Sequence, residues 1–238
     1  MRVRHFAILL AACGGSSAAS GADAGGGSGS AGTGTGTLVV TGSLDATPQV
    51  GNASDPASFT VDIAVRLQRA GSDVTAGTVT VASSGGSVDL VYDPASARWH
   101  GAQAGYAASY TLDVAAGSDT ITGVTVDGPA IHTVTAPIAG VTVDSTMALA
   151  VAWAPASAGD QAAISTRDLH AVDITDTGSY TLAAGTLRSK PDQVENDDIQ
   201  IARSRSVVPA GAAPGSLVAV IVENGIDVVI QPTGSGSN

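Results

Sequence analysis

Residues Phe59–Leu67 read FTVDIAVRL, and this stretch decides the fold. Apolar Phe, Val, Ile, Val and Leu alternate along it with Thr, Asp, Ala and Arg. A period of two is typical of a strand with one apolar face and one polar face. Shorter alternations recur at 79–81, 88–92, 110–114 and 124–126, and turn-forming Gly, Ser, Asp and Pro separate them. Many short strands at this spacing favour an antiparallel β-sandwich.

The second half of the chain carries the same kind of pattern. Alanines separate Leu149, Val151 and Trp153, which places these three side chains on one face and predicts that Trp153 lies in the core. Asn224-Gly225 separates two apolar runs and suits a type I′ turn, so we expect a hairpin there. The arms of this hairpin are expected at 217–223 and 226–231, and further strands at 161–166, 169–175, 179–183 and 198–206.

Pro and Gly in Asp127-Gly128-Pro129 interrupt strand pairing and mark a junction between two domains. Residues 38–128 and 129–232 are then each about the size of a seven-stranded sandwich. Residues 233–238 are expected to form a flexible tail. The predicted fold class is all-β, with two tandem antiparallel β-sandwiches.

The N-terminus has the composition of an export signal. Residues 1–12 combine Arg2 and Arg4 with a short apolar run, which is too short to span a bilayer. Residues 13–37 begin with Cys13, the single cysteine, and then consist mainly of Gly, Ser, Ala and Thr. With so little apolar bulk to offset the loss of chain entropy, this stretch is expected to be a disordered tether.

Leu10-Ala11-Ala12-Cys13 resembles the lipobox of bacterial lipoproteins. The resemblance implies that Cys13 is lipidated and becomes the first residue of the mature chain. Gly14 follows it in place of Asp, which by the same resemblance permits export to the outer membrane or cell surface. The membrane is therefore an expected partner, through the lipid anchor.

Three further stretches resemble known β-sandwich families. Pro129, Pro137 and Leu149–Pro155 are similar to the opening strands of fibronectin type III domains. Trp99-x-Gly101 followed by Tyr110–Val114 resembles a late strand of bacterial immunoglobulin-like modules, and Asp176–Tyr180 resembles the tyrosine corner of immunoglobulin domains. Together they imply an extracytoplasmic structural or binding module.

Composition excludes several other classes. The 238 residues include 21 acidic and 10 basic side chains, so clustered Lys and Arg for nucleic-acid phosphates are missing and no nucleic-acid partner is expected. One cysteine excludes a disulfide scaffold. No apolar run reaches the length of about 18 residues that a membrane-spanning helix needs.

Catalytic motifs such as G-x-S-x-G, H-E-x-x-H and the P-loop are absent from the sequence. His132 and His170 fall on expected strands, where we interpret them as surface residues, and neither they nor His100 is expected to be catalytic. We therefore expect no enzyme activity and no cofactor, and a structural or protein-interaction role in the cell envelope.

Two alternative binding roles stay open. Asp192, Glu195, Asp197 and Asp198 form a carboxylate-rich stretch that could hold calcium, although an acidic loop is usually just a solvated turn. Trp99 and Tyr106 could contact a glycan if they are exposed, whereas the scarcity of aromatic residues, 3%, favours Trp99 in the core. The alternative function is a carbohydrate- or calcium-binding surface module.

Overall fold

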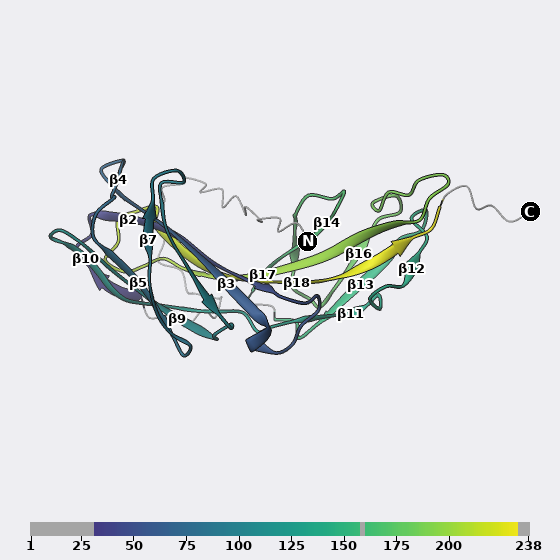
Figure 1. The fold of residues 1–238 in the computed structure, drawn as a ribbon, viewed down its shortest axis with the longest axis horizontal. Helices are drawn as coiled ribbons and strands as arrows, with labels where there is room; N and C mark the ends of the chain where they lie inside the picture. The colour runs from purple at the N-terminus through teal and green to yellow at the C-terminus, as the bar shows by residue number, and fades with distance from the viewer. Residues whose placement is uncertain (1–30, 158–159, 233–238) are drawn as a thin grey trace, which may run out of the picture.

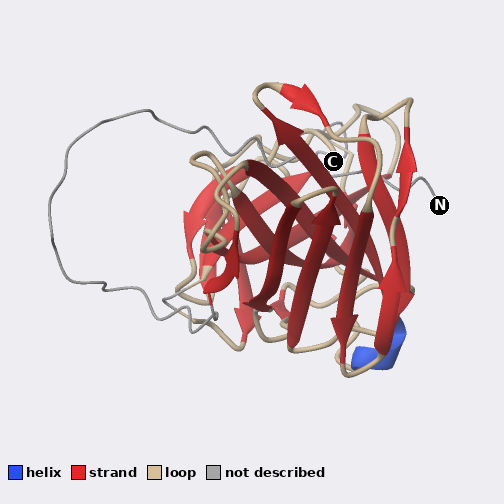
Figure 2. Ribbon diagram, turned by 90° about the vertical axis from the view of Figure 1, so that its left-hand side faces the viewer, coloured by secondary structure: helices blue, strands red, loops and turns tan. Residues whose placement is uncertain are grey.

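The computed structural model describes residues 31–157 and 160–232, and nearly all its regular structure is β-strand. One large sheet and two smaller sheets make up the fold (Figure 1). The all-β, antiparallel sandwich architecture predicted from the sequence is confirmed. Figure 2 shows the short 3-10 turn η1 (Pro56–Ser58) in blue among the strands, and Asp55 caps it by accepting a hydrogen bond from the Ala57 N–H.

The large sheet is ten-stranded and runs the length of the molecule. Its main path has the order β15 (Val172–Thr175), β14 (Gln161–Thr166), β17 (Glu195–Val207), β18 (Leu217–Ile230), β2 (Leu38–Pro48), β3 (Phe59–Arg69), β8 (Arg98–Ala104) and β7 (Val91–Asp93). Two short strands lie off this path: β12 (Thr142–Val143) pairs with β18, and β4 (Ser72–Asp73) pairs with β3. Pairing is antiparallel except where β2 and β12 meet β18.

The two smaller sheets form the second layer of the sandwiches. The five-stranded sheet has the order β1 (Ala31–Gly34), β10 (Asp119–Asp127), β9 (Ser109–Ala116), β5 (Thr78–Ser83) and β6 (Gly86–Asp89). The three-stranded sheet has the order β11 (Thr133–Ala136), β13 (Leu149–Ala154) and β16 (Ser179–Leu182).

The first apolar core lies between the five-stranded sheet and the large sheet. The apolar side chains of Phe59–Leu67 all point into it and are at most 2% exposed, as their alternation predicts. Facing them are alternate residues of β5, β9 and β10, such as Val81, Leu112 and Val124. The second core packs Val151 and Trp153 of β13 against Ile199 and Ile201 of β17, which confirms the buried position of Trp153.

Strands β17 and β18 form one continuous antiparallel ribbon that belongs to both cores. Their register is unbroken over 13 residue pairs, from Glu195↔Ile230 to Val207↔Val218. Alternate residues of β18 therefore all point to one side: Val218, Val220 and Val222 enter the first core, and Ile226, Val228 and Ile230 enter the second. We name this side of the large sheet the covered face and the other side the opposite face.

The predicted hairpin at Asn224-Gly225 is wrong. Both residues lie inside β18, pair with Ile201 and Gln200, and have no positive φ. The side chain of Asn224 is fully buried, and its Nδ2 donates hydrogen bonds of 2.7 Å to the carbonyls of Ala53 and His132. These tertiary contacts, together with the long ladder to β17, outweigh the local preference of the dipeptide for a turn.

The tether predicted for residues 13–37 is wrong at its C-terminal end, because Ala31–Gly34 forms β1 on the edge of the five-stranded sheet. Thr33 lies opposite Thr122 of β10, and their hydroxyls are 3.1 Å apart. A Cβ on Gly34 would come within 2.6 Å of the Gly211 carbonyl oxygen, so glycine permits this close approach. The Gly-Thr repeat thus serves as a strand, with β-branched Thr paired across the sheet.

The predicted domain boundaries at 128 and 232 stay predictions. The cores add a fact that the sequence did not predict: β18, the last strand of the described residues, completes a core that begins at residue 38. Among residues 31–157 and 160–232, no helix is long and apolar enough to cross a bilayer.

Candidate functional site

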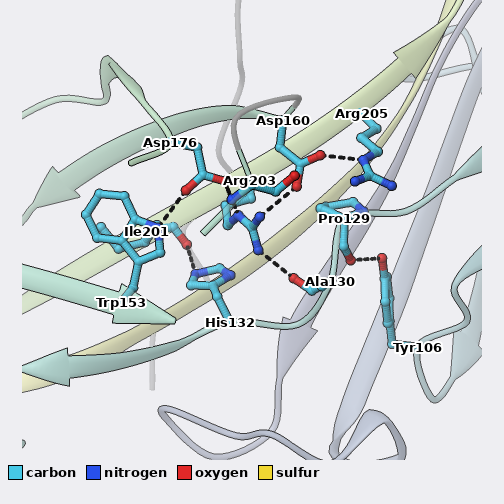
Figure 3. A network of polar contacts seen from close by, with 11 residues as sticks. Tyr106, Pro129, Ala130, His132, Trp153, Asp160, Asp176, Ile201, Arg203 and Arg205 are labelled. Atoms are coloured by element: carbon cyan, nitrogen blue, oxygen red, sulfur yellow. Dashed lines mark hydrogen bonds and ion pairs between the residues drawn. The ribbon is translucent and has the colours of Figure 1, made fainter. Parts of the chain in front are cut away.

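A polar cluster interrupts the covered face where the two cores meet, and Arg203 of β17 lies at its centre (Figure 3). Arg203 follows Ile199 and Ile201 of the second core in the same alternation and pairs with Val222 of the first core. Its side chain is fully buried. A buried charge requires partners, because an unpaired ion loses its hydration without compensation.

Three connecting segments outside the strands supply those partners. Arg203 Nη2 donates to Asp160 Oδ2 and Nε to Asp176 Oδ2, both at 2.7 Å, and Nη1 donates to the Ala130 carbonyl at 2.8 Å. Both carboxylates are themselves fully buried. Asp176 also accepts from Trp153 Nε1 at 2.8 Å, which fixes the indole of the second core.

The charges within this cluster balance. Asp160 binds a second guanidinium through its Oδ1, that of the partly exposed Arg205. Two carboxylates thus face two guanidiniums, and Asp176 Oδ2 accepts a further bond from the Ser157 N–H. Charge-assisted bonds of this kind orient the groups they join. What this arrangement can do is fix the positions of the segments that carry Ala130, Asp160 and Asp176 relative to β17.

The segment held in this way is the connection between the two sandwiches. Arg203 binds the Ala130 carbonyl, and the Tyr106 hydroxyl donates to the Pro129 carbonyl at 2.6 Å. Asn224 binds the His132 carbonyl next to them. Asn52 adds a further link, because its side chain accepts from the Val134 N–H and donates to the Val134 carbonyl.

The interpretation of His132 as a surface residue is wrong. Its side chain is fully buried, and Nε2 lies 3.1 Å from the Ile201 carbonyl oxygen. Burial, with the nearby Arg203 charge, lowers the pKa of His132 to about 4, so the ring is neutral near pH 7. His170 is exposed, as expected, although it lies outside the strands.

The structure does not bring the four predicted calcium residues together into a cage. Asp192 is exposed, and Glu195 pairs with Lys190 and Arg167. Asp197 points the opposite way from Asp198, is buried, and accepts the backbone N–H groups of Arg167 and Asp198 at Oδ1. Burial raises the pKa of the Asp197 carboxyl. Among the described residues, no group of three or more His, Cys, Asp or Glu could hold a metal ion.

The two predicted glycan residues pack against protein. Trp99 is buried, contacts the Tyr92 ring, and donates from Nε1 to the Val74 carbonyl. Tyr106 is partly buried, and its ring packs between Phe59 and Tyr110. Neither ring offers the exposed face that stacking on a sugar needs. Cys13, the predicted lipidation site, lies outside the described residues.

Sequence reasoning missed the polar cluster around Arg203, although a signal for it exists. Ile199, Ile201 and Arg203 share one phase of the alternation in β17, so an arginine stands where the pattern calls for a buried residue. Such a position requires partly buried acidic partners elsewhere in the chain. No local feature of the sequence identifies Asp160 and Asp176 as the partners of Arg203, because this pairing depends on tertiary contacts.

A second unusual carboxyl lies on the opposite face of the large sheet. Glu223 of β18 neighbours Asp45 of β2, and burial, followed by the charge of Asp45, raises its pKa to about 7. The folded state therefore holds a proton that the unfolded chain releases at lower pH. Stability should fall as the pH rises from about 4.5 to about 7 and change little from this group above that range.

Glu223→Gln is expected to stabilise the protein by up to about 3 kcal/mol at pH 8 and to leave stability at pH 4 unchanged. The amide removes the cost of ionising a half-buried group, and that cost is absent where both states are protonated. Urea denaturation at the two pH values measures the difference. Asp192→Asn, at an exposed loop position, is the control and should change stability little at either pH. Equal gains at both pH values would contradict the prediction.

Comparison with known proteins gives few relatives. No family model matches the chain, and no curated protein matches it. Among solved structures, the fibronectin(III)-like modules of Clostridium thermocellum CbhA match 84% of this chain and 97% of their own, with 10% identity and a TM-score of 0.28. The immunoglobulin domains IG1+IG2 of DIP-gamma match 82% of this chain and 98% of their own, with 7% identity and a TM-score of 0.24.

A third match, the BSP domain of a biofilm associated protein, covers 83% of this chain and 30% of its own, with 11% identity and a TM-score of 0.24. The structural neighbours of this chain are thus fibronectin III-like and immunoglobulin domains. Scores this low carry no argument about its function. The class that the strands and cores themselves define is an all-β protein with two sandwich cores on one shared sheet.

Proposed function

We propose that this chain is a lipid-anchored lipoprotein of the bacterial outer membrane or cell surface, whose two sandwich cores form a rigid non-enzymatic body for structural support or protein interaction. The observation that carries the rigid body is the shared β17–β18 ribbon, which both cores use. The location rests on the lipobox-like sequence that ends at Cys13.

The polar cluster supports this role rather than a catalytic one. Arg203, Asp160 and Asp176 neutralise one another and hold the Ala130 carbonyl of the connecting segment. Domain pairs joined only by a linker and a small interface move relative to each other by default. A shared ribbon and a buried ion-pair cluster oppose such motion, which suits a body that presents a surface at a fixed geometry.

Cys13→Ser should move the protein from the membrane fraction to the soluble fraction of the exported material. A multiply acylated cysteine buries many methylenes, each worth about 0.8 kcal/mol, and serine cannot receive those chains. Fractionation followed by detection of the protein measures the shift. Ser16→Ala, in the same stretch, is a matched control that should stay with the membrane. Membrane retention of Cys13→Ser would contradict the anchor.

A further inference from the structure

The connecting segment between the two sandwiches, residues 128–134, carries a single titratable side chain, that of His132 (Figure 3). The side chain is fully buried, and its Nε2 lies 3.1 Å from the Ile201 carbonyl oxygen of β17. Carbonyl oxygens only accept hydrogen bonds, so Nε2 carries the proton of the neutral ring and Nδ1 carries a lone pair. A further proton therefore has to bind at Nδ1.

The closed structure offers Nδ1 no place for that proton. Among residues 31–157 and 160–232, no group forms a hydrogen bond with Nδ1, although this atom is buried. An N–H group formed there would lose its hydration without gaining an acceptor, which destabilises a protein interior. The added charge would also lie near the guanidinium of Arg203, which repels it. Burial and like charge thus both oppose the protonated ring.

The carboxylates nearest to the ring are already occupied. Asp160 binds the guanidiniums of Arg203 and Arg205, and Asp176 binds Arg203. The charge of Asp176 favours a protonated His132, but it is outweighed by burial and by Arg203. The polar cluster therefore holds the ring in its neutral form.

The other described elements around the connecting segment keep their titratable groups neutral or turned away from the ring. Tyr106 donates its hydroxyl to the segment, and burial raises the pKa of that phenol. Strand β18 places Asn224 against the segment, while the adjacent Glu223 points to the opposite face of the large sheet. Asp55 is exposed and caps η1. These groups give a proton on His132 no compensation.

We propose that His132 is an acid-triggered release for the connecting segment. A solvent proton that binds Nδ1 stabilises only a state in which the ring has left its site, so acid shifts the equilibrium toward that state. In it, the segment has lost its bonds to Arg203, Asn224 and Asn52, while the large sheet stays folded. The inference goes beyond the proposed function, because it makes the rigidity of the body depend on pH.

The direction and size of the effect follow from the two protonation equilibria. Burial, followed by the charge of Arg203, lowers the pKa of His132 from 6.5 to about 4. The released segment thus binds a proton that the closed segment excludes, so the closed state is most stable above pH 6.5 and loses stability as the pH falls toward 4. The equilibrium constant for opening should rise about 20-fold between about pH 7 and pH 5.

Residue-resolved hydrogen exchange of the full chain carrying Cys13→Ser measures this opening. The reporters are the Gly128 and Val134 amides, which donate to the Ala108 carbonyl and to the Asn52 side chain. Their protection factors should fall about 20-fold from about pH 7 to pH 5. The Ile63 amide, in the first core, should stay better protected at both pH values. Equal protection of Ile63 and the reporters would show global unfolding in place of release and would overturn the proposal.

His132→Gln separates the histidine from the carboxylates of the cluster. Glutamine keeps an N–H donor for the Ile201 carbonyl and takes up no proton, so the protection factors should change less than about twofold over the same pH range. His170→Gln, at an exposed position, is the matched control and should keep the full response. A full response in His132→Gln would assign the acid sensitivity to other groups and would sink the proposal.

A second measurement needs no substitution at His132. In NMR spectra of the Cys13→Ser chain, the His132 ring should stay in the neutral form with its proton on Nε2 down to about pH 5. Titration of this ring at about pH 6.5, as for a solvated imidazole, would contradict the proposal. Fractionation of Cys13→Ser tests the proposed anchoring independently, so the two proposals can fail separately.

Discussion

Arg203→Met is expected to lower the free energy of unfolding by about 3–5 kcal/mol. Methionine keeps much of the apolar stem but leaves Asp160 and Asp176 without their shared guanidinium, and both are fully buried. Asp176 would keep the Trp153 and Ser157 N–H donors, and Asp160 would keep Arg205, so the loss is large without being total. Equilibrium urea denaturation measures it.

Arg66→Met is the matched control. Arg66 pairs with Asp73 at 2.9 Å, but both side chains are substantially exposed, 40% and 29%. Exposed pairs contribute about 0–1 kcal/mol, so this variant should unfold close to the parent. Adding Asp160→Asn and Asp176→Asn to Arg203→Met should recover part of the lost stability, because amides need no counter-ion. If Arg203→Met costs no more than Arg66→Met, the cluster does not hold the junction.

The fragment of residues 31–128 is expected to remain unfolded on its own. It contains the whole five-stranded sheet but lacks β18, which supplies Val218, Val220 and Val222 to the first core and pairs with Thr41–Ala46 of β2. Each of these valines contributes about 1.5–3 kcal/mol when buried, and a domain is stable by only about 5–15 kcal/mol. Circular dichroism and hydrogen exchange of the purified fragment measure the outcome.

The same fragment extended by a flexible linker and residues 215–223 provides the control. The added strand restores both the pairing with β2 and the three core valines, so the extended fragment should show slower hydrogen exchange. The full chain should unfold in one transition, because the ribbon couples both cores. Cooperative unfolding of residues 31–128 alone would instead support an independent domain ending at 128.

Strands whose alternation is regular were predictable from the sequence. Phe59–Leu67 and the run through Trp153 fall where their period of two places them, since that pattern depends only on which side chains face a core. The continuous strand through Asn224-Gly225 was not predictable, because the local preference of this dipeptide for a turn is outweighed by a 13-pair ladder and two buried side-chain hydrogen bonds. Strand β1 was also not predicted, because residues 31–34 have little apolar content; its Gly34 packs closely against Gly211.

The candidate site was less accessible to sequence reasoning than the fold. Arg203 shares the phase of Ile199 and Ile201, where an apolar residue is expected, but its partners lie 27 and 43 residues away in sequence. Glu223 and Asp45, whose proximity helps to raise the Glu223 pKa, are also far apart in sequence and meet because β2 pairs with β18. Pairings between such distant strands cannot be read from a single sequence.

The separation of β2 from β18 along the chain has a consequence for biosynthesis. Residues 217–222 leave the ribosome about 170 residues after β2, and until they do, β2 has no partner on one of its edges. The strands of the first core that precede them are therefore made well before the strand that completes it. During that interval the unfinished core exposes apolar side chains that a holding chaperone can bind, and the core closes only once residues 217–222 have been made.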